Sequence, residues 1–135
     1  MALNAKKHLV IKRSSIPNAG KGLFTKVFIP KGQVITEYKG KITTWEDADH
    51  DDGKNLYIYY VNKHYVIDAK NRKSALARYA NDGNGFKKTR GNSNNSTYII
   101  ENNRVFIKAI KNIQPGSEIL VSYGRTYWNT LQKLN

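Results

Sequence analysis

The sequence has no cysteine, and only three prolines, three histidines and one methionine in 135 residues. Without cysteine, disulfide scaffolds, iron–sulfur clusters, cysteine nucleophiles and cysteine-based zinc sites are all excluded. The histidines (His8, His50 and His64) lie far apart in the sequence, so we expect no metal site.

Long apolar segments are missing as well. No stretch approaches the about 20 apolar residues that a membrane-spanning helix needs, so we expect no membrane association. Residues 1–8 include two lysines but no apolar run, and we expect no signal peptide there. A chain of 135 residues suits one domain. We therefore expect a flexible N-terminus at residues 1–8 and a single domain at residues 9–135.

Acidic residues are scarce: ten Asp and Glu stand against 23 Lys and Arg, which gives a net charge of +13. Such a balance usually indicates a polyanionic partner, most often a nucleic acid, although it also accompanies AT-biased genomes. Half of the acids fall in residues 46–52 (EDADHDD). This segment lacks the spacing of an EF-hand calcium loop, which leaves a solvated loop or a contact patch for a basic partner.

Short apolar and β-branched runs separated by turn residues predict a mainly β domain. We expect strands at residues 9–13, 23–28, 33–38, 56–61, 65–67, 97–101, 105–110 and 119–121. Asn102-Asn103 predicts a two-residue hairpin turn, and Asn62-Lys63 predicts a second. Helical signals are short, at residues 45–49 (capped by Thr44), 74–79 and 125–134. Residues 81–96, rich in Asn and Gly, predict a long loop.

Two features could contact a ligand. Gly20 and Gly22 come directly before a predicted strand, where they form either a plain turn or a backbone that a ligand can approach closely. The nine tyrosines suit core packing, a channel lined by phenol rings, or a surface that stacks bases. Strand alternation places Tyr57 and Tyr59 on one face and Tyr60 on the other. No catalytic triad or carboxylate pair emerges from the spacing.

The order of several motifs resembles that of the SET-domain family. The opening motifs are residues 15–24 (SIPNAGKGLF), 29–32 (IPKG) and 37–40 (EYKG). Residues 67–69 (IDA) and 77–81 (ARYAN) resemble the middle of the domain, and residues 116–124 (GSEILVSYG) resemble its closing motif. The match extends over roughly residues 9–128. The absence of cysteine-rich flanks makes the chain most similar to minimal viral and bacterial members.

The resemblance implies a fold and an activity. The SET fold is a set of small curved β-sheets with few short helices and a threaded C-terminal pseudoknot, an exception to the rule against threading. Its members transfer methyl groups from S-adenosylmethionine to protein lysines, by in-line displacement in a tyrosine-lined channel. The implied substrate is a histone tail or another basic DNA-associated protein, in the cytoplasm or a host nucleus. Because flanking support is missing, such a minimal form is also expected to form homodimers.

The resemblance also implies roles for individual residues. Tyr123 matches the catalytic tyrosine, with Tyr98 and Tyr57 as further channel tyrosines. The expected cofactor contacts are the backbone of the glycine segment, the middle motif and an aromatic residue that packs on the adenine: Gly20, Lys21, Gly22, Arg78, Asn81, Asp82 and Trp128.

The chain departs from the family at three places. Asp82-Gly83 replaces the usual His-Ser, which puts an acid near the expected adenine position. Residues 84–95 replace a Cys-x-Pro-Asn stretch and carry Lys87, Lys88 and Arg90. Val121 stands where many members have Tyr or Phe, a position that affects how many methyl groups are added.

Three functional hypotheses therefore remain: a lysine methyltransferase, a SET-fold binding module with weak or no activity, and a basic nucleic-acid-binding β domain. The net charge bears on all three, because it would repel a basic substrate. We expect residues 46–52 to receive the basic peptide, and the basic surface around Lys87, Lys88 and Arg90 to contact DNA.

Overall fold

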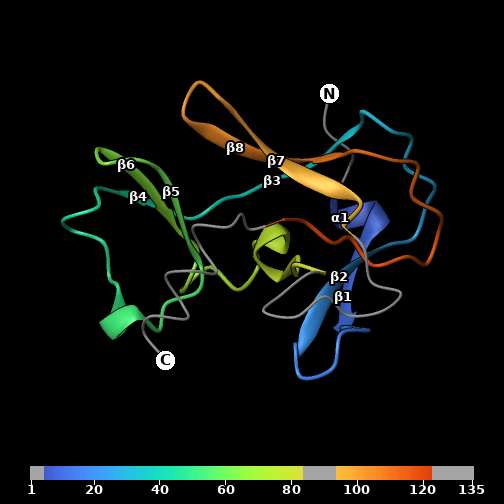
Figure 1. Ribbon diagram of the computed structural model, residues 1–135, viewed down its shortest axis with the longest axis horizontal. Helices are drawn as coiled ribbons and strands as arrows, with labels where there is room; N and C mark the ends of the chain where they lie inside the picture. The colour runs from blue at the N-terminus through green and yellow to red at the C-terminus, as the bar shows by residue number, and fades with distance from the viewer. Residues whose placement is uncertain (1–4, 84–93, 123–135) are drawn as a thin grey trace.

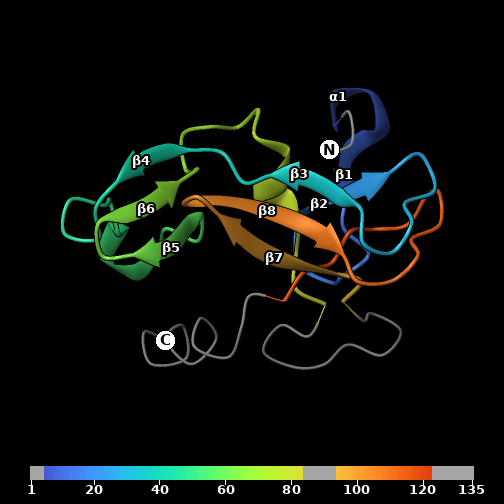
Figure 2. The same cartoon turned by 90° about the horizontal axis from the view of Figure 1, so that it is seen from above.

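The structure of the protein, a computed structural model, describes residues 5–83 and 94–122. The strands in these residues pair into three small antiparallel sheets (Figures 1 and 2). One sheet pairs β1 with β2, the second has the order β3-β8-β7 and the third has the order β4-β6-β5. The expected mainly β fold of small sheets with few short helices is confirmed. The elements are α1 (Ala5–His8), β1 (Leu9–Arg13), β2 (Lys21–Thr25), β3 (Val34–Glu37), β4 (Lys41–Thr43), η1 (Asp51–Gly53), β5 (Ile58–Asn62), β6 (Tyr65–Asp68), η2 (Leu76–Tyr79), β7 (Ser96–Glu101) and β8 (Arg104–Ala109).

The three sheets lie side by side, with β4-β6-β5 at one end, β3-β8-β7 in the middle and β1-β2 at the other end (Figure 2). The short 3-10 helix η2 packs against β1, β2 and β3 near the centre (Figure 1). The interior is formed by fully buried aliphatic side chains from all parts of the chain: Leu23, Ile29, Ile35, Val66, Val105, Ile107, Ile119 and Val121.

Most predicted strands are found, with shifted ends. β2 ends at Thr25 rather than at residue 28, because the Thr25 hydroxyl bonds both the N–H and the C=O of Val27 and turns the chain out of the sheet. The three-residue strand β4 was not predicted, since so short a run carries no alternation. Residues 119–121 do not form a strand, because this segment makes only isolated bridges to separate neighbours.

Of the two predicted hairpin turns, one is confirmed and the other is shifted by one residue. Asn102 and Asn103 adopt φ values of 51° and 63°, as the predicted β7–β8 hairpin turn requires. Gly32 and Gly116, which come shortly after Pro30 and Pro115, also have positive φ values, of 92° and 86°. The β5–β6 turn differs by one residue, because Asn62 pairs with Tyr65 and leaves Lys63-His64 as the turn. The Asn62 side-chain oxygen accepts the His64 N–H at 2.9 Å, so Asn62 stabilises the turn although it belongs to β5.

The helical signals give shorter elements than expected. Residues 74–79 yield only the 3-10 helix η2. Thr44 caps its turn as predicted, because its hydroxyl accepts the Asp47 N–H at 3.1 Å. The expected helix at residues 125–134 lies outside the described residues.

The closing segment, residues 117–121, runs between two parts of the chain that are distant in sequence. The Ile119 N–H donates to the Leu23 carbonyl at 2.7 Å, and the Val121 N–H donates to the Asn81 carbonyl at 2.9 Å. On the other side, the Ser96 N–H and hydroxyl both donate to the Leu120 carbonyl. Its described neighbours, Asn81 and Ser96, flank the predicted long loop, which is the arrangement that the expected C-terminal pseudoknot requires.

In the described segments, no helix is long and apolar enough to cross a bilayer. Nor does this part of the chain bring three or more His, Asp or Glu side chains together in a way that could hold a metal ion.

Candidate functional site

Three tyrosine rings line a narrow, partly open cavity of about 50 Å³ between two of the sheets. Tyr98 comes from β7, Tyr59 from β5, and Tyr38 directly follows β3. The centroid distances are 4.9 Å for Tyr59–Tyr98, 5.9 Å for Tyr38–Tyr59 and 6.2 Å for Tyr38–Tyr98, with steeply inclined ring planes. The two contacts of Tyr98 are edge-to-face and the Tyr38–Tyr59 contact is tilted, and such contacts favour fixed ring orientations. The described residues that also line the cavity are Leu56, Ile58, Arg78 and Ala80.

The phenol groups of this cavity are neutral hydrogen-bonding groups. The Tyr38 hydroxyl donates to the Tyr57 carbonyl at 2.8 Å, which fixes the ring of a side chain that is only 6% exposed. Burial raises the pKa of the Tyr59 phenol above its ordinary value of 10.0. The Tyr59 hydroxyl therefore stays protonated throughout the physiological pH range.

Arg78 provides a fixed positive charge in the cavity wall. From η2, its Nη1 donates to the carbonyl oxygens of Ala69 and Lys70, both at 2.7 Å. Its guanidinium lies 4.1 Å from the centroid of the Tyr57 ring and 4.9 Å from that of Tyr79, in cation–π geometry. The buried Nε has no hydrogen-bond partner among the described residues. The cavity thus combines three phenols with one permanent cation.

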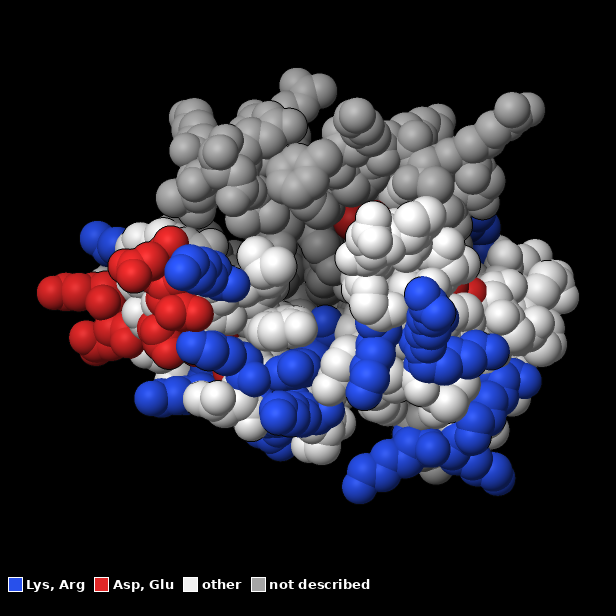
Figure 3. Space-filling view, turned by 90° about the horizontal axis from the view of Figure 1, so that it is seen from below, with Lys and Arg blue, Asp and Glu red and all other residues white. Residues whose placement is uncertain are grey.

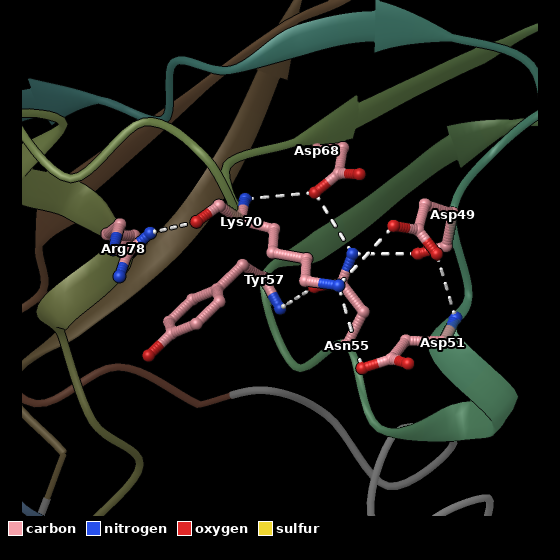
Figure 4. A network of polar contacts seen from close by, with 7 residues as sticks. All are labelled: Asp49, Asp51, Asn55, Tyr57, Asp68, Lys70 and Arg78. Carbon is pink, nitrogen blue, oxygen red and sulfur yellow. Dashed lines mark hydrogen bonds and ion pairs between the residues drawn. The ribbon is translucent and has the colours of Figure 1, made fainter.

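A polar network connects this wall to the acidic segment of residues 46–52 (Figure 4). The Asn55 amide donates to the Asp49 carbonyl at 2.8 Å and to the Asp68 carboxylate at 3.1 Å. The Lys70 ammonium lies 3.4 Å from the Asp49 carboxylate and 3.5 Å from that of Asp51. These contacts hold part of the acidic segment against the loop that Arg78 also binds.

The glycine segment, residues 20–22, lies beside the middle motif. The Asn81 side-chain amide donates to the Lys21 carbonyl at 3.0 Å, while the neighbouring Ala80 lines the tyrosine cavity. Gly20 has a φ of +71°, and among the described residues other than its chain neighbours no atom lies within 4 Å of the position that a Cβ would occupy. The backbone at Gly20 is therefore open to a ligand. The adjacent residues Ala80 and Asn81 connect the cavity, which Ala80 lines, with the glycine segment, which Asn81 binds.

Glu118 is a buried carboxylate beneath the glycine segment, and no pattern outside the closing motif predicts a role for it. It is 7% exposed and accepts hydrogen bonds from the Ser14 hydroxyl at 2.7 Å and from the Ser15 N–H and hydroxyl at 2.9 and 2.6 Å. A Cβ on Gly22 would overlap its Oε2. Gly22 is thus required by close packing against Glu118, a reason that sequence reasoning did not supply.

Asp82, which replaces the usual histidine, lies at the start of the predicted long loop at residues 81–96 and contacts its other described end. It is 6% exposed, and its carboxylate accepts the Asn94 amide at 3.0 Å. The Asn94 side-chain oxygen in turn accepts the Gly83 N–H at 2.7 Å. Asp82 and Asn94 therefore link the two described ends of the loop.

The structure brings some of the expected site residues together and separates others. Tyr98 lines the cavity, whereas the Tyr57 ring packs under Arg78 outside the cavity lining. Sequence reasoning missed Tyr38 and Tyr59 as cavity residues. The alternation that paired Tyr59 with Tyr57, and the EYKG motif around Tyr38, were the available signals. Tyr123 and Trp128 lie outside the described residues.

Comparisons with known proteins agree on the family. The family model of the SET domain matches residues 20–124. The histone-lysine N-methyltransferase set-17 of Caenorhabditis elegans is 33% identical over 120 residues, which cover 88% of this chain and 42% of the relative. The N-lysine methyltransferase KMT5A-A of Danio rerio is 28% identical over 120 residues, covering 81% of this chain and 33% of that protein.

Solved structures show the same fold. The methyltransferase domain of human PR domain-containing protein 2 aligns with a TM-score of 0.62 and 24% identity, over 87% of this chain and 77% of that one. A structure of ctPRC2 in an autoinhibited conformation bound to S-adenosylmethionine aligns with a TM-score of 0.69 and 25% identity, over 94% of this chain and 16% of that one.

The chain spans less than half the length of these two curated relatives. The match to the SET-domain model nevertheless covers most of this chain and spans the strands from β2 to β8. We therefore reject the hypothesis of an unrelated nucleic-acid-binding β fold. The chain belongs to the SET-domain family.

Proposed function

We propose that this chain transfers a methyl group from S-adenosylmethionine to a lysine side chain of a protein. The observation that carries the proposal is the narrow cavity between Tyr38, Tyr59 and Tyr98, with Arg78 in its wall. An unbranched aliphatic chain that ends in an amine suits such a cavity, because aromatic faces pack against methylenes and phenol oxygens accept N–H groups.

The residues of the cavity can prepare the amine for reaction. Lysine must react as the neutral amine, and both desolvation and a nearby positive charge lower the pKa of an ammonium group. The tyrosine rings supply the desolvation, and the Arg78 guanidinium supplies the charge. Neutral phenols then orient the amine lone pair without adding a negative charge, which would raise the pKa of the lysine again. Catalysis on this account is mainly orientation of the reactants.

The cofactor, when bound, supplies an activated methyl group on a sulfonium centre. We place its site at the glycine segment, where the backbone of Gly20 is open, and at Asn81, since the segment that bears Asn81 also lines the cavity. Trp128 and Asp82 remain proposed contacts to the adenine side. Tyr123 is the proposed catalytic tyrosine by its match to the closing motif.

The proposed substrate is a histone or another basic DNA-associated protein. Both relatives described above are named lysine methyltransferases, and one is named for histone lysine. In this chain the acidic segment at residues 46–52 offers complementary charge, and the network through Asn55 and Lys70 fixes it near Arg78. A basic peptide that crosses the acidic segment could direct one lysine into the cavity.

The direct test incubates the full chain with tritiated S-adenosylmethionine and a mixture of core histones, followed by mass spectrometry of the labelled bands. We expect label on lysine, and we expect the Tyr123→Phe variant to lose most of it. Absence of lysine label, or an equally active Tyr123→Phe variant, would contradict the proposal.

A binding module without catalysis is the second candidate, because an acid at position 82 replaces a family histidine. Thermal unfolding with S-adenosylmethionine separates the two. A cofactor at about 100 times its dissociation constant stabilises a fold by roughly 2.7 kcal/mol. No shift in melting temperature favours the module.

The same samples, run in sedimentation velocity, test the expected homodimer.

A further inference from the structure

A second and larger hollow lies on the other side of Tyr38. It has a volume of about 280 Å³ and is bounded by β3, β4, β6 and the β7–β8 hairpin turn. The side chains that matter for its chemistry are Glu37, Lys39, Tyr65, Arg72 and Arg104. Three of these five are cations, and we call this cavity the basic hollow.

One of the cations is already neutralised. Arg104 makes a two-pronged contact with Glu37, with Nε–Oε2 at 3.0 Å and Nη2–Oε1 at 2.7 Å. This contact, with a smaller effect of the nearby Lys39 charge, lowers the pKa of the Glu37 carboxyl. Glu37 is therefore ionised at neutral pH, and the pair contributes no net charge to the hollow.

The other two cations remain uncompensated. Lys39 and Arg72 are exposed, and neither forms an ion pair with a described acidic residue. The basic hollow therefore carries a net charge of about two positive units, in a concave site where low-dielectric walls strengthen the field. The phenol of Tyr65 adds a neutral hydrogen-bonding group.

The charge of the whole chain favours a polyanion over an isolated acid at this site. Five of the ten acids lie in residues 46–52, and that segment contains no Lys or Arg. Figure 3 shows acidic side chains gathered at one end of the face seen from below, and Lys and Arg spread over much of the remainder. Of the five acids elsewhere, Glu37 is paired, while Asp82 and Glu118 are buried.

We propose that the basic hollow binds a phosphate of a nucleic-acid backbone through Lys39 and Arg72. An arginine fork and a lysine ammonium both suit phosphate oxygens. A nucleic acid presents phosphates at regular spacing, so neighbouring phosphates also meet the surrounding positive field, which a single carboxylate of a peptide cannot do. The proposal does not depend on methyl transfer.

The location connects this site to the tyrosine cavity, because Tyr38 lines both hollows. A phosphate held by Lys39 and Arg72 would lie next to the wall of the candidate lysine channel. Nucleic acid at the basic hollow would thus bring a protein that is bound to the same strand close to the cavity.

The test measures the fluorescence anisotropy of a labelled 20-base-pair duplex with the full chain at several salt concentrations. The variant Lys39→Ala/Arg72→Ala is compared with Lys26→Ala/Lys31→Ala, which removes the same charge at exposed positions outside the hollow. Each lost phosphate contact lowers the slope of log K against log salt by about 0.9. We expect the first variant to bind about tenfold more weakly with a slope smaller by roughly 0.9, and the second to stay close to the parent.

Three outcomes of the duplex titrations overturn the proposal: no duplex binding by the parent chain, an equal loss in both double variants, or a Lys39→Ala/Arg72→Ala variant that binds like the parent. Labelled polyglutamate of equal charge is the remaining arm. If polyglutamate binds as tightly as the duplex and depends on the same two residues, the hollow is a site for acidic peptides instead. Circular dichroism of both variants checks that these exposed changes leave the fold intact.

Discussion

The rings of Tyr59 and Tyr98 meet at a centroid distance of 4.9 Å and an interplanar angle of 66°, although the two residues belong to different sheets. Tyr38, at the end of a third strand, contacts both rings. The cavity therefore exists only when the β3-β8-β7 and β4-β6-β5 sheets are packed in their native arrangement. The same three side chains therefore contribute both to the packing of the two sheets and to the polar groups of the cavity.

The raised pKa of Tyr59 predicts a stability change at alkaline pH. A group whose pKa is higher in the folded than in the unfolded state contributes stability below its unfolded pKa, near 10.0, and that stability is lost as the pH rises further. The Tyr59→Phe variant lacks this ionisation, so its free energy of unfolding should fall less steeply above pH 10. Urea titrations at several pH values measure the difference. Tyr60→Phe, an exposed neighbour, should follow the parent; a Tyr59→Phe curve parallel to the parent would contradict the assignment.

Gly22 and Glu118 should be energetically coupled. A Cβ on Gly22 would overlap the Glu118 carboxylate, so Gly22→Ala should lower the free energy of unfolding by about 1–3 kcal/mol. In a Glu118→Ser background, the same substitution should cost at least about 1 kcal/mol less. A double-mutant cycle from denaturant unfolding measures this coupling.

Gly20→Ala is the matched control for that cycle. Gly20 has a positive φ, but no described residue beyond its chain neighbours lies within 4 Å of its Cβ position, so the expected cost of about 1–2 kcal/mol comes from the backbone. The effects of Gly20→Ala and Glu118→Ser should therefore add. Equal coupling at the two glycines would show that close packing against Glu118 is not the cause.

Arg78 predicts a shift in the pH dependence of methyl transfer. If its charge lowers the pKa of the bound substrate lysine, Arg78→Met should move the rise of kcat with pH to higher values, while Arg78→Lys keeps more of the parent profile, because kcat reports ionisations in the enzyme–substrate complex. A pH profile distinguishes this from a structural role, which would lower activity equally at every pH. Superimposable profiles for the parent and Arg78→Met would count against the electrostatic role.

The fold was predicted well wherever local patterns decide the structure. β1 appears with its predicted ends, and the Asn102-Asn103 turn has the positive φ values that asparagine tolerates. The prediction was poorer where contacts distant in sequence decide. Residues 119–121 look like a strand in isolation, but bonds to Leu23, Asn81 and Ser96 hold them as a bridging segment.

The site was predicted only in part, for the same reason. Strand alternation could place Tyr59 beside Tyr57, yet the start of β5 at Ile58 leaves Tyr57 to pack under Arg78 instead. That Tyr38 and Tyr98 meet Tyr59 depends on how two sheets pack together, which no local pattern encodes. The carboxylate of Glu118 beneath Gly22 depends likewise on residues about a hundred positions apart.

The central claim is that the cavity between Tyr38, Tyr59 and Tyr98 receives the substrate lysine. The most direct measurement is single-turnover methyl transfer from labelled S-adenosylmethionine to core histones by the parent chain, Tyr98→Phe and Tyr60→Phe. We predict a loss of at least about tenfold for Tyr98→Phe, which removes a phenol oxygen that orients the amine, and parent-like transfer for the exposed Tyr60→Phe. Equal rates for Tyr98→Phe and Tyr60→Phe would contradict the claim.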